Sequence, residues 1–296
     1  KKIVSAAGFQ CIPGCELRKK TNSEIAFLGN KVGYPLMIKA TSGGGGKGMR
    51  LVTRQEELHK ELKIAQAEAL SSFGSNEIIF ERAITHARHV EIQIFGDTLG
   101  NIIHLGERDC SVQRRHQKIF EEAPCPKMDK KLRQAMGQTA VKIAKAINYV
   151  GAGTIEFLLD NNDDFYFLEM NTRLQVEHPV TELVTGLDLV YLQFLIADGQ
   201  NLPIKQNEIE LKGHAIETRL YAEDPANDFL PSSGLLKSWS IEELQGVRID
   251  NGYYEGNLVT PFYDPMLAKI IGYGATRKQA LDNLTCALEN SSIFGV

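Results

Sequence analysis

Polar and apolar residues alternate along residues 167–179, Phe-Leu-Glu-Met-Asn-Thr-Arg-Leu-Gln-Val-Glu-His-Pro. Because successive side chains of an extended strand point to opposite faces, this period of two predicts a strand with one polar face. That face would hold two carboxylates, two amides and a guanidinium, namely Glu169, Asn171, Arg173, Gln175 and Glu177. A strand that is merely solvated rarely carries these groups in one row. The pattern therefore predicts a site that binds a metal ion and an anion together.

A second β-prone segment, residues 153–159, is apolar except for Glu156, and the Asp-Asn-Asn-Asp-Asp run at residues 160–164 is a turn signal. A hairpin that closes in the middle of this turn would place Glu156 opposite Glu169. Like charges directly across a sheet destabilise it, so the pair needs a reason, which a bridging divalent cation would supply. Two carboxylates with the amide oxygen of Asn171 suit Mg²⁺ or Mn²⁺. We therefore expect a divalent metal site on this hairpin.

Hydrophobic periodicity and capping signals predict the other elements in chain order. Helices are expected at residues 1–8, 22–32, 53 to about 70, 129–148, 181–186, 188–198 and from 276. Strands are expected at residues 36–40, 49–53, 76–82, 88–95, 101–106 and 211–221, with a β-rich region at 229–275. Thr53 and Glu56 form a capping-box pattern at the start of the third helix.

Four consecutive glycines follow the short strand at residues 36–40, within Thr41–Arg50. A glycine-rich stretch is often only a linker, but this one joins two β-prone runs. It lacks the Gly-Lys-Ser/Thr ending of a phosphate-binding loop before a helix, and it lacks the spacing of the dinucleotide fingerprint. Free backbone N–H groups can fold over an anion. The loop is interpreted as a flap over nucleotide phosphates.

The most cationic segment is Glu107–Lys118, in which His116 and Lys118 can donate hydrogen bonds to oxyanions. The segment has no aromatic residue to stack on a base, and the formal net charge of the chain is −4. These features argue against nucleic acid as a partner and favour a small anionic substrate.

Composition agrees with an ordinary globular protein of two domains or one elaborated domain: 296 residues, 43% hydrophobic and 24% charged. No apolar run has the length of a membrane span and no secretory signal is present, so no membrane partner is expected. Five scattered cysteines suit a reducing compartment, the cytoplasm or, in a eukaryote, the mitochondrial matrix. The chain starts without methionine at Lys1, and both ends suggest a fragment of a longer protein.

With these motifs assembled, the chain resembles the biotin carboxylase family of the ATP-grasp superfamily along essentially its whole length. The two most specific motifs are Gln-Arg-Arg-His-Gln-Lys, ending at Lys118, and Glu-Met-Asn-Thr-Arg-Leu-Gln-Val-Glu-His-Pro, ending at Pro179. Further segments that carry the resemblance are residues 38–49, 88–93, 107–112, 151–154, 214–225 and 263–266.

The resemblance implies an α+β chain with an ATP-grasp fold. A small lid subdomain carries the glycine flap, a larger antiparallel-sheet domain follows, and a biotin carboxylase C-terminal region completes the chain. The implied boundaries are an ATP-grasp domain over 1–203, with the lid at about 13–83, and a truncated C-terminal domain over 204–296. The family's N-terminal domain would be absent, so the fragment could be inactive.

The implied reaction is ATP- and Mg²⁺-dependent carboxylation of biotin by bicarbonate through carboxyphosphate. The metal ligands would be Glu156, Glu169 and Asn171. The catalytic residues would be Lys118 and Arg173 at bicarbonate, Glu177 as the base, and Arg219 at the ureido oxygen of biotin. Nucleotide and bicarbonate contacts would come from Lys39, Gly45, Gly46, Glu81, Arg82, Ala83, Ile84, His89, Gln113, His116, Leu158, Gln175 and Val176.

The implied partners are a biotinyl carrier domain and a carboxyltransferase subunit or domain, within a homodimer or larger complex. Two alternatives stay open. One is another ATP-grasp ligase such as a carbamoyl-phosphate synthetase, although the spacing of His214 and Arg219 favours the biotin branch. The other is a nucleotide-binding module without catalysis. The acyl-CoA or keto acid that finally accepts the carboxyl group is not specified, although residues 149–153 and 220–224 favour acyl-CoA carboxylases.

Overall fold

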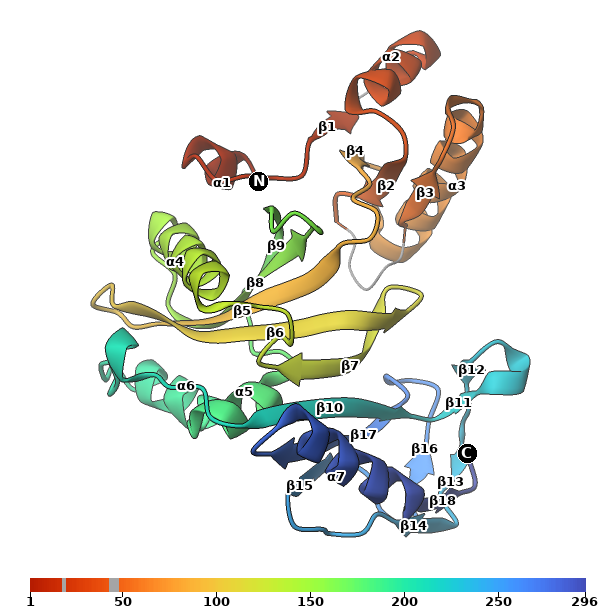
Figure 1. The fold of residues 1–296 in the computed structure, drawn as a ribbon. Helices are drawn as coiled ribbons and strands as arrows, with labels where there is room; N and C mark the ends of the chain where they lie inside the picture. The colour runs from red at the N-terminus through yellow and green to blue at the C-terminus, as the bar shows by residue number, and fades with distance from the viewer. Residues whose placement is uncertain (18–19, 43–47) are drawn as a thin grey trace. The chain divides into compact units, whose positions relative to one another are not determined.

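The computed structural model describes residues 1–17, 20–42 and 48–296 of the chain (Figure 1). The chain forms two compact units. Unit 1 comprises Lys1–Arg88, Gln113–Gln117 and Phe157–Glu169, and unit 2 comprises His89–Val112, Lys118–Glu156 and Met170–Val296. The predicted phosphate contacts Gly45 and Gly46 lie outside the described residues.

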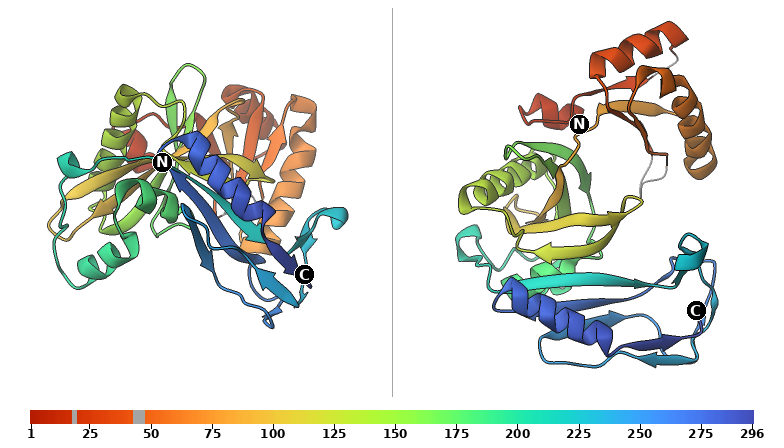
Figure 2. Two further views of the ribbon diagram at one scale, coloured as in Figure 1. Left: turned by 60° about the horizontal axis from the view of Figure 1, so that its bottom comes forward. Right: turned by 45° about the vertical axis from the view of Figure 1, so that its right-hand side comes forward.

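Unit 1 contains a four-stranded antiparallel sheet in the order β1-β4-β2-β3. Its strands are β1 (Gly14–Leu17), β2 (Leu36–Ala40), β3 (Arg50–Val52) and β4 (Ile78–Arg82). Helices α2 (Asn22–Val32) and α3 (Leu58–Phe73) accompany this sheet (Figures 1 and 2). Leu36 and Ile38 on β2 share one core with Leu58 and Leu62 on α3. The alternating apolar positions of β2 therefore face the helix, as the sequence pattern predicts.

The start of α3 differs from the predicted capping box. A 3₁₀ turn, η1 (Gln55–Glu57), precedes the helix, and Thr53 donates its hydroxyl to Glu57 at 3.0 Å. The expected pairing of Thr53 with Glu56 is therefore wrong. The helical turn begins one residue later than predicted, with Arg54 at its N-cap, so its third residue is Glu57 rather than Glu56.

Unit 2 contributes most of an eight-stranded sheet in the order β15-β17-β10-β7-β6-β5-β8-β9. The strands are β5 (Arg88–Gly96), β6 (Ile102–Arg114), β7 (Gln117–Ala123), β8 (Gly151–Leu159), β9 (Phe165–Asn171), β10 (His214–Tyr221), β15 (Val247–Asn251) and β17 (Met266–Gly274). The pairing of β10 with β7 joins segments about a hundred residues apart in the sequence. The candidate site is built on this sheet.

Four longer helices accompany the sheet: α4 (Lys130–Ala146), α5 (His178–Thr185), α6 (Leu189–Ala197) and α7 (Arg277–Glu289). Asp129 caps α4 by accepting the N–H of Leu132 at 2.7 Å. The buried face of α4 includes Met136, Ala140 and Ile143, whereas Ile147 lies past the helix end and is 38% exposed. The core under α7 comes from β10 and β17.

The remaining elements are short. They are α1 (Lys2–Ala6), η2 (Gln206–Glu208), η3 (Pro225–Asn227), β11 (Glu223–Asp224), β12 (Leu230–Pro231), β13 (Gly234–Leu235), β14 (Ser238–Ser240), β16 (Leu258–Val259) and β18 (Ser292–Phe294). Among the described residues, no single helix has the length and apolar composition to cross a membrane. Helices α5 and α6 meet that test only when counted as one pair, and a 96° bend separates them.

The predicted long strand at residues 167–179 is wrong in its second half. Strand β9 ends at Asn171, and residues 172–177 form an irregular segment that leads into α5. The His178 N–H donates to the Gln175 carbonyl at 3.3 Å, and Pro179 occupies the first turn of α5. A proline lacks an N–H and has a helical φ, so it fits a helix start and interrupts a strand ladder. The polar row is therefore divided between a strand and a turn.

The predicted hairpin between β8 and β9 is confirmed. The Asp160 N–H donates to the Asp164 carbonyl at 2.9 Å, which closes the turn around residues 161–163. Strands β8 and β9 are neighbours in the sheet. The direct opposition of Glu156 and Glu169 stays a prediction.

Candidate active site

A buried charged cluster lies on the eight-stranded sheet within unit 2. We define the cluster as Glu91, Arg108, Lys118, Glu121, Glu156, Glu177 and Arg219. At its centre, Lys118 Nζ on β7 lies 2.6 Å from Glu91 on β5 and 2.9 Å from Glu156 on β8. The same ammonium lies 2.7 Å from Glu177, which occupies the N-cap position of α5. One cation therefore joins three carboxylates that come from three different elements.

Mutual attraction keeps Lys118, Glu91 and Glu156 ionised despite their burial. Burial lowers the pKa of Lys118, but the nearby carboxylates, Glu91 foremost, outweigh it and raise that pKa. For Glu91, burial opposes ionisation, yet Arg108 and Lys118 lower its pKa to about 2. Burial likewise opposes ionisation of Glu156, and a hydrogen bond from His89 together with Lys118 lowers its pKa. The groups are therefore charged at neutral pH, and each one depends on its partners.

Arg108 on β6 is fully buried and organises one side of the cluster. Its guanidinium donates to Glu91 at 2.5 Å, Gln93 at 2.7 Å, Thr181 at 2.9 Å, Thr154 at 3.1 Å and Gln175 at 3.2 Å. No role is predicted for Arg108 from the sequence. Its neighbours Glu107, Asp109 and Arg114 are also charged, so no local signal marks Arg108 as the one that is fully buried among partners.

Replacing Arg108 by methionine is expected to destabilise the protein by about 3–5 kcal/mol, because Glu91 loses one of its two cations and several buried acceptors lose their donor. Urea unfolding of the full-length protein measures this change. The matched control is Arg54→Met, because Arg54 is 76% exposed and pairs with Glu57 at the surface. A loss equal to that of the control would contradict the role given to Arg108.

Glu156 brings together four of the predicted site residues. Its carboxylate contacts His89 at 2.7 Å, Lys118 at 2.9 Å, Asn171 at 2.9 Å and Gln175 at 3.1 Å. Burial lowers the pKa of His89, but the hydrogen bond and charge of Glu156 outweigh it and raise that pKa. These five residues, which were predicted from separate motifs, therefore lie together.

The donor set around Glu156 fits a hard divalent cation. Glu156 supplies a carboxylate, and Asn171 supplies an amide whose oxygen and nitrogen exchange places on a simple flip. Two other groupings offer metal-ligand atoms, His89–Glu91–Glu156 and Glu91–Cys110–Glu177. Lys118 already contacts all three carboxylates of these groupings, and its positive charge disfavours a second cation there. The predicted third ligand, Glu169, is exposed and belongs to unit 1.

Arg219 on β10 holds the other end of the cluster. Its Nε donates to Glu121 at 2.7 Å, and its Nη2 donates to Glu177 at 3.1 Å. Glu177 therefore lies between two cations, Lys118 and Arg219, and both contacts are short enough for charge-assisted hydrogen bonds. This arrangement can hold an anion next to a carboxylate base.

Two residues predicted at the bicarbonate pocket are placed differently from Lys118. Arg173 is exposed on the segment after β9, and its Nη1 donates to the Leu174 carbonyl at 3.3 Å. No hydrogen bond or ion pair joins Arg173 to Lys118 or Glu177 in the part of the chain that the structure describes. Val176 presents its carbonyl to Lys269 Nζ at 2.9 Å.

Unit 1 holds a second group of predicted residues around Glu81 on β4. Lys39 Nζ on β2 lies 2.8 Å from the buried Glu81 carboxylate, and Lys1 Nζ also pairs with it. Burial lowers the pKa of Lys39, while Glu169 opposes that change. Burial, helped by repulsion from Lys39, lowers the pKa of Lys1 to about 8. Two ammonium groups on one carboxylate leave excess positive charge, which suits a phosphate.

The other predicted nucleotide contacts also belong to unit 1. Arg82 ends β4 and is exposed, and Ala83 donates its N–H to the Pro35 carbonyl at 2.9 Å. His116 is exposed in the turn between β6 and β7 with a φ of 67°. Ile84, Gln113 and Leu158 are half-buried. The structure places these residues without testing their roles.

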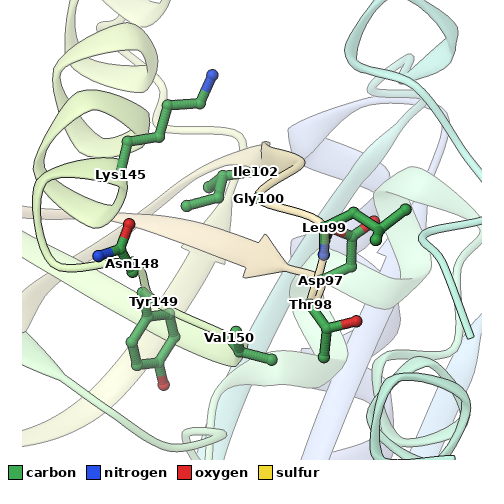
Figure 3. Close-up of a pocket in the computed structure, with 9 residues that line it drawn as sticks. All are labelled: Asp97, Thr98, Leu99, Gly100, Ile102, Lys145, Asn148, Tyr149 and Val150. Atoms are coloured by element: carbon green, nitrogen blue, oxygen red, sulfur yellow. Dashed lines mark hydrogen bonds between the residues drawn. The ribbon is translucent and has the colours of Figure 1, made fainter. Parts of the chain in front are cut away.

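A cavity of ≈ 550 Å³ in unit 2 contains none of the predicted site residues (Figure 3). It lies between the β5–β6 turn and the end of α4, and it is lined by Asp97, Thr98, Leu99, Gly100, Ile102, Lys145, Asn148, Tyr149 and Val150. Asp97 accepts hydrogen bonds from the N–H groups of Leu99, Asn101 and Leu202, so its carboxylate braces the turn. We therefore place the candidate active site at the charged cluster.

Comparison with known protein families divides the chain into two matches. Residues 1–205 match the family model of the carbamoyl-phosphate synthase L chain, ATP binding domain. Residues 217–296 match the biotin carboxylase C-terminal domain. The order of the two matches is the order that the sequence motifs predict.

Curated relatives cover the whole chain at about half identity. Biotin carboxylase of Halalkalibacterium halodurans is 50% identical over 296 residues, which are 65% of its length. The mitochondrial methylcrotonoyl-CoA carboxylase subunit alpha of Rattus norvegicus is 48% identical over 297 residues, which are 42% of its length. The chain thus spans less than two thirds of these relatives.

Solved structures agree with these matches. The biotin carboxylase domain of Hydrogenobacter thermophilus 2-oxoglutarate carboxylase, in complex with MgADP, ADP and bicarbonate, superposes with a TM-score of 0.97 at 41% identity. The biotin carboxylase–β,γ-ATP complex from Campylobacter jejuni gives 0.94 at 43% identity. All of this chain is covered in both, with 65% and 66% of the respective structures. The predicted α+β, ATP-grasp architecture is confirmed, and the chain belongs to the biotin carboxylase family.

Proposed function

We propose that this chain catalyses the ATP- and Mg²⁺-dependent carboxylation of biotin by bicarbonate through carboxyphosphate. The observation that carries the proposal is the placement of Glu177 between Lys118 at 2.7 Å and Arg219 at 3.1 Å. A carboxylate base flanked by two fixed cations suits a reaction whose substrate is an anion that must lose a proton. The family match and the bicarbonate and MgADP named for a solved relative support the same reaction.

In the first step, Lys118 and Arg173 hold bicarbonate, with Gln175 and the backbone of Val176 completing the pocket. Arg173 is exposed, so binding an anion costs it no ion pair among the described residues. Glu177 removes the bicarbonate proton, and the resulting oxygen nucleophile attacks the γ-phosphoryl group of ATP, which breaks the β–γ P–O bond, releases ADP and forms carboxyphosphate. Reaction between two anions depends on charge neutralisation and alignment, which these cations supply.

In the second step, carboxyphosphate releases CO₂ and phosphate, and the phosphate takes the proton from the biotin nitrogen. Arg219 stabilises the negative charge that then develops on the ureido oxygen, and the deprotonated biotin nitrogen attacks the CO₂ to form carboxybiotin. Its two present partners, Glu121 and Glu177, hold the guanidinium in place before biotin arrives. A fixed donor needs no reorganisation during the reaction, which favours the charged intermediate.

The remaining predicted site residues are proposed to bind ATP and its metal ion. Glu156, Glu169 and Asn171 would hold Mg²⁺ or Mn²⁺, which neutralises phosphate charge when bound. The proposed nucleotide contacts are Lys39, Gly45, Gly46, Glu81, Arg82, Ala83, Ile84, His89, Gln113, His116 and Leu158. The lysine pair at Glu81 and the oxygen donors at Glu156 support this assignment.

The proposal extends to organisation and partners. We propose an ATP-grasp domain over residues 1–203, with its lid at about 13–83, and a biotin carboxylase C-terminal domain over 204–296. A biotinyl carrier domain presents biotin, a carboxyltransferase takes the product, and the protein works as a homodimer or larger complex in the cytoplasm or the mitochondrial matrix. The subunit and mitochondrial names of the methylcrotonoyl-CoA carboxylase relatives and the dimer named for one solved relative support this scheme.

Bicarbonate-dependent ATP cleavage by the full-length protein tests the proposal, measured with and without free biotin. We expect cleavage to require bicarbonate and to rise when biotin is added. A carbamoyl-phosphate synthetase, which the family match of residues 1–205 keeps as the second candidate, would respond to an ammonia donor and ignore biotin. Binding of ATP without any cleavage would favour a non-catalytic nucleotide-binding module.

A further inference from the structure

Two buried carboxyl groups lie directly opposite each other on the neighbouring strands β7 and β10, and one of them accepts a hydrogen bond from Arg219. Glu217 on β10 pairs in register with Glu121 on β7, and both residues are 0% exposed. Directly opposed residues of an antiparallel pair point to the same face of the sheet, with their Cβ atoms about 4.5–5.5 Å apart. Like charges in this position destabilise a sheet, so the pair requires a physical explanation.

Within the described part of the chain, neither carboxylate oxygen of Glu217 has a hydrogen-bond partner. One carboxylate oxygen of Glu121 also has none. The other Glu121 oxygen accepts from Arg219. An ionised carboxylate that is buried without a donor is strongly unfavourable and takes up a proton instead. The geometry therefore excludes two ionised carboxylates at this position.

The nearby cations do not change this conclusion. The groups that act on Glu217 are Glu121, Lys269, Glu177 and Arg219, from three strands and the segment before α5. Lys269 Nζ on β17 already contacts Asp250 at 3.2 Å and the Val176 carbonyl, and Arg219 already contacts Glu121 and Glu177. Each cation is thus directed at another carboxylate or carbonyl.

The pKa directions agree with this picture. Burial, followed by repulsion from Glu121, raises the pKa of Glu217 well above its ordinary value. Burial raises the pKa of Glu121 to about 7, although Arg219 opposes that change. Groups that interact this strongly titrate as a pair.

We propose that Glu121 and Glu217 hold one proton between them and act as positioning residues for Arg219. With one proton, the pair carries a single negative charge, which holds the guanidinium without cancelling its attraction for a ligand anion. With no proton, Glu121, Glu177 and Glu217 surround one arginine with three negative charges. The arginine would then no longer favour the negative oxygen of the biotin intermediate. This inference rests on the proposed function for the role of Arg219.

The protonated pair has a consequence for stability that is independent of catalysis. Both folded-state pKa values lie above the ordinary glutamate value, so the folded protein binds more protons than the unfolded chain between these values. Stability is therefore greatest below the ordinary glutamate pKa, and it is lost as pH rises from there through the pair's folded-state pKa values, of which that of Glu121 is about 7.

The test uses the full-length protein with Glu217→Gln, which keeps the shape of the pair and fixes its charge at one negative unit. Glu242→Gln, at an exposed position, is the matched control. In the wild type and the control, kcat/KM for biotin is expected to fall about tenfold per pH unit above the pair's pKa. In Glu217→Gln that fall is expected to disappear, with wild-type activity at neutral pH. An unchanged alkaline fall in Glu217→Gln would overturn the proposal.

Two further measurements separate this proposal from the proposed function. The infrared carbonyl-stretch band of a protonated carboxylic acid is expected near neutral pH in the wild type and is lost in Glu217→Gln. The Tm of the wild type is expected to fall relative to that of Glu217→Gln by on the order of 3 °C per pH unit between the ordinary glutamate pKa and the folded-state pKa of the pair, and to level off above it. Absence of the band, or a Tm difference that does not change with pH, contradicts the shared proton. A wild type that shows both signals but no biotin-dependent turnover contradicts only the proposed function.

Discussion

Replacing Lys118 by methionine is expected to abolish measurable bicarbonate-dependent ATP cleavage, with a loss of at least about 10²–10³-fold. The substitution removes the only cation that contacts Glu91, Glu156 and Glu177 together within the described structure. Three buried carboxylates then repel one another where bicarbonate has to bind. We also expect a loss of about 3–5 kcal/mol of stability, because an ion-paired buried group loses its partner. Steady-state ADP release and urea unfolding measure the two effects.

A second substitution separates the loss of folding from the loss of catalysis. Lys118→Arg keeps the positive charge, so it is expected to recover most of the stability. Its planar guanidinium group is expected to misplace the bicarbonate anion. Lys278→Met is the control, because Lys278 is 82% exposed and pairs with Asp282 at the surface. Full activity in Lys118→Met would rule out the central place given to this ammonium group.

Replacing Glu177 by glutamine is expected to lower kcat for bicarbonate-dependent ATP cleavage by about 10²–10⁴-fold, because the amide cannot accept the bicarbonate proton. Glutamine has the shape of glutamate. In the wild type, the carboxylate of Glu177 accepts hydrogen bonds from Lys118 at 2.7 Å and from Arg219 at 3.1 Å. Nucleotide affinity is expected to stay unchanged, since the proposed ATP contacts lie elsewhere. Rapid-quench measurement of ADP, together with equilibrium nucleotide binding, distinguishes the two effects.

The exposed residue Glu255 supplies the control for this substitution, since Glu255→Gln removes the same charge away from the cluster. The base role predicts a loss in Glu177→Gln alone. A Glu177→Gln variant that cleaves ATP at the wild-type rate would show that another group takes the proton.

Local signals in the sequence were enough to predict much of the fold. The predicted helix at residues 22–32 matches α2, since Thr21 and Glu24 form a capping box and Gly33 follows the last turn. The predicted strand at 36–40 matches β2, because a short apolar run follows Gly33-Tyr-Pro35 and precedes the glycine-rich loop. These signals are contained within a few residues of each element, so no distant partner is needed to interpret them.

The charged cluster could be predicted only in part. Alternation selected Asn171, Gln175 and Glu177, and the apolar run around Glu156 selected that residue. Neither pattern could show that β9 ends at Asn171 and that the segment after it carries Gln175 and Glu177. An alternating pattern records which residues are polar, whereas the hydrogen bonds that end a strand depend on its neighbours. The roles assigned to these residues came from the resemblance to a family.

Arg108, Glu121 and Glu217 were missed for a related reason. Glu217 meets Glu121 only because β10 pairs with β7, and this register is set by packing between segments far apart in the sequence. Within its own segment, Glu217 is one charged residue on a strand, which is ordinarily a solvated position. Burial and pairing together reveal its unusual environment.

Transfer of oxygen from bicarbonate to phosphate tests the central claim most directly. In the proposed reaction a bicarbonate oxygen attacks the γ-phosphoryl group, so that oxygen stays on phosphorus when carboxyphosphate breaks down. The full-length protein would be supplied with ATP, Mg²⁺, biotin and bicarbonate labelled with heavy oxygen, and the released phosphate would be analysed by mass spectrometry. We predict one labelled oxygen in each phosphate, together with carboxylated biotin. Unlabelled phosphate would show that water attacks ATP and would contradict the proposed function.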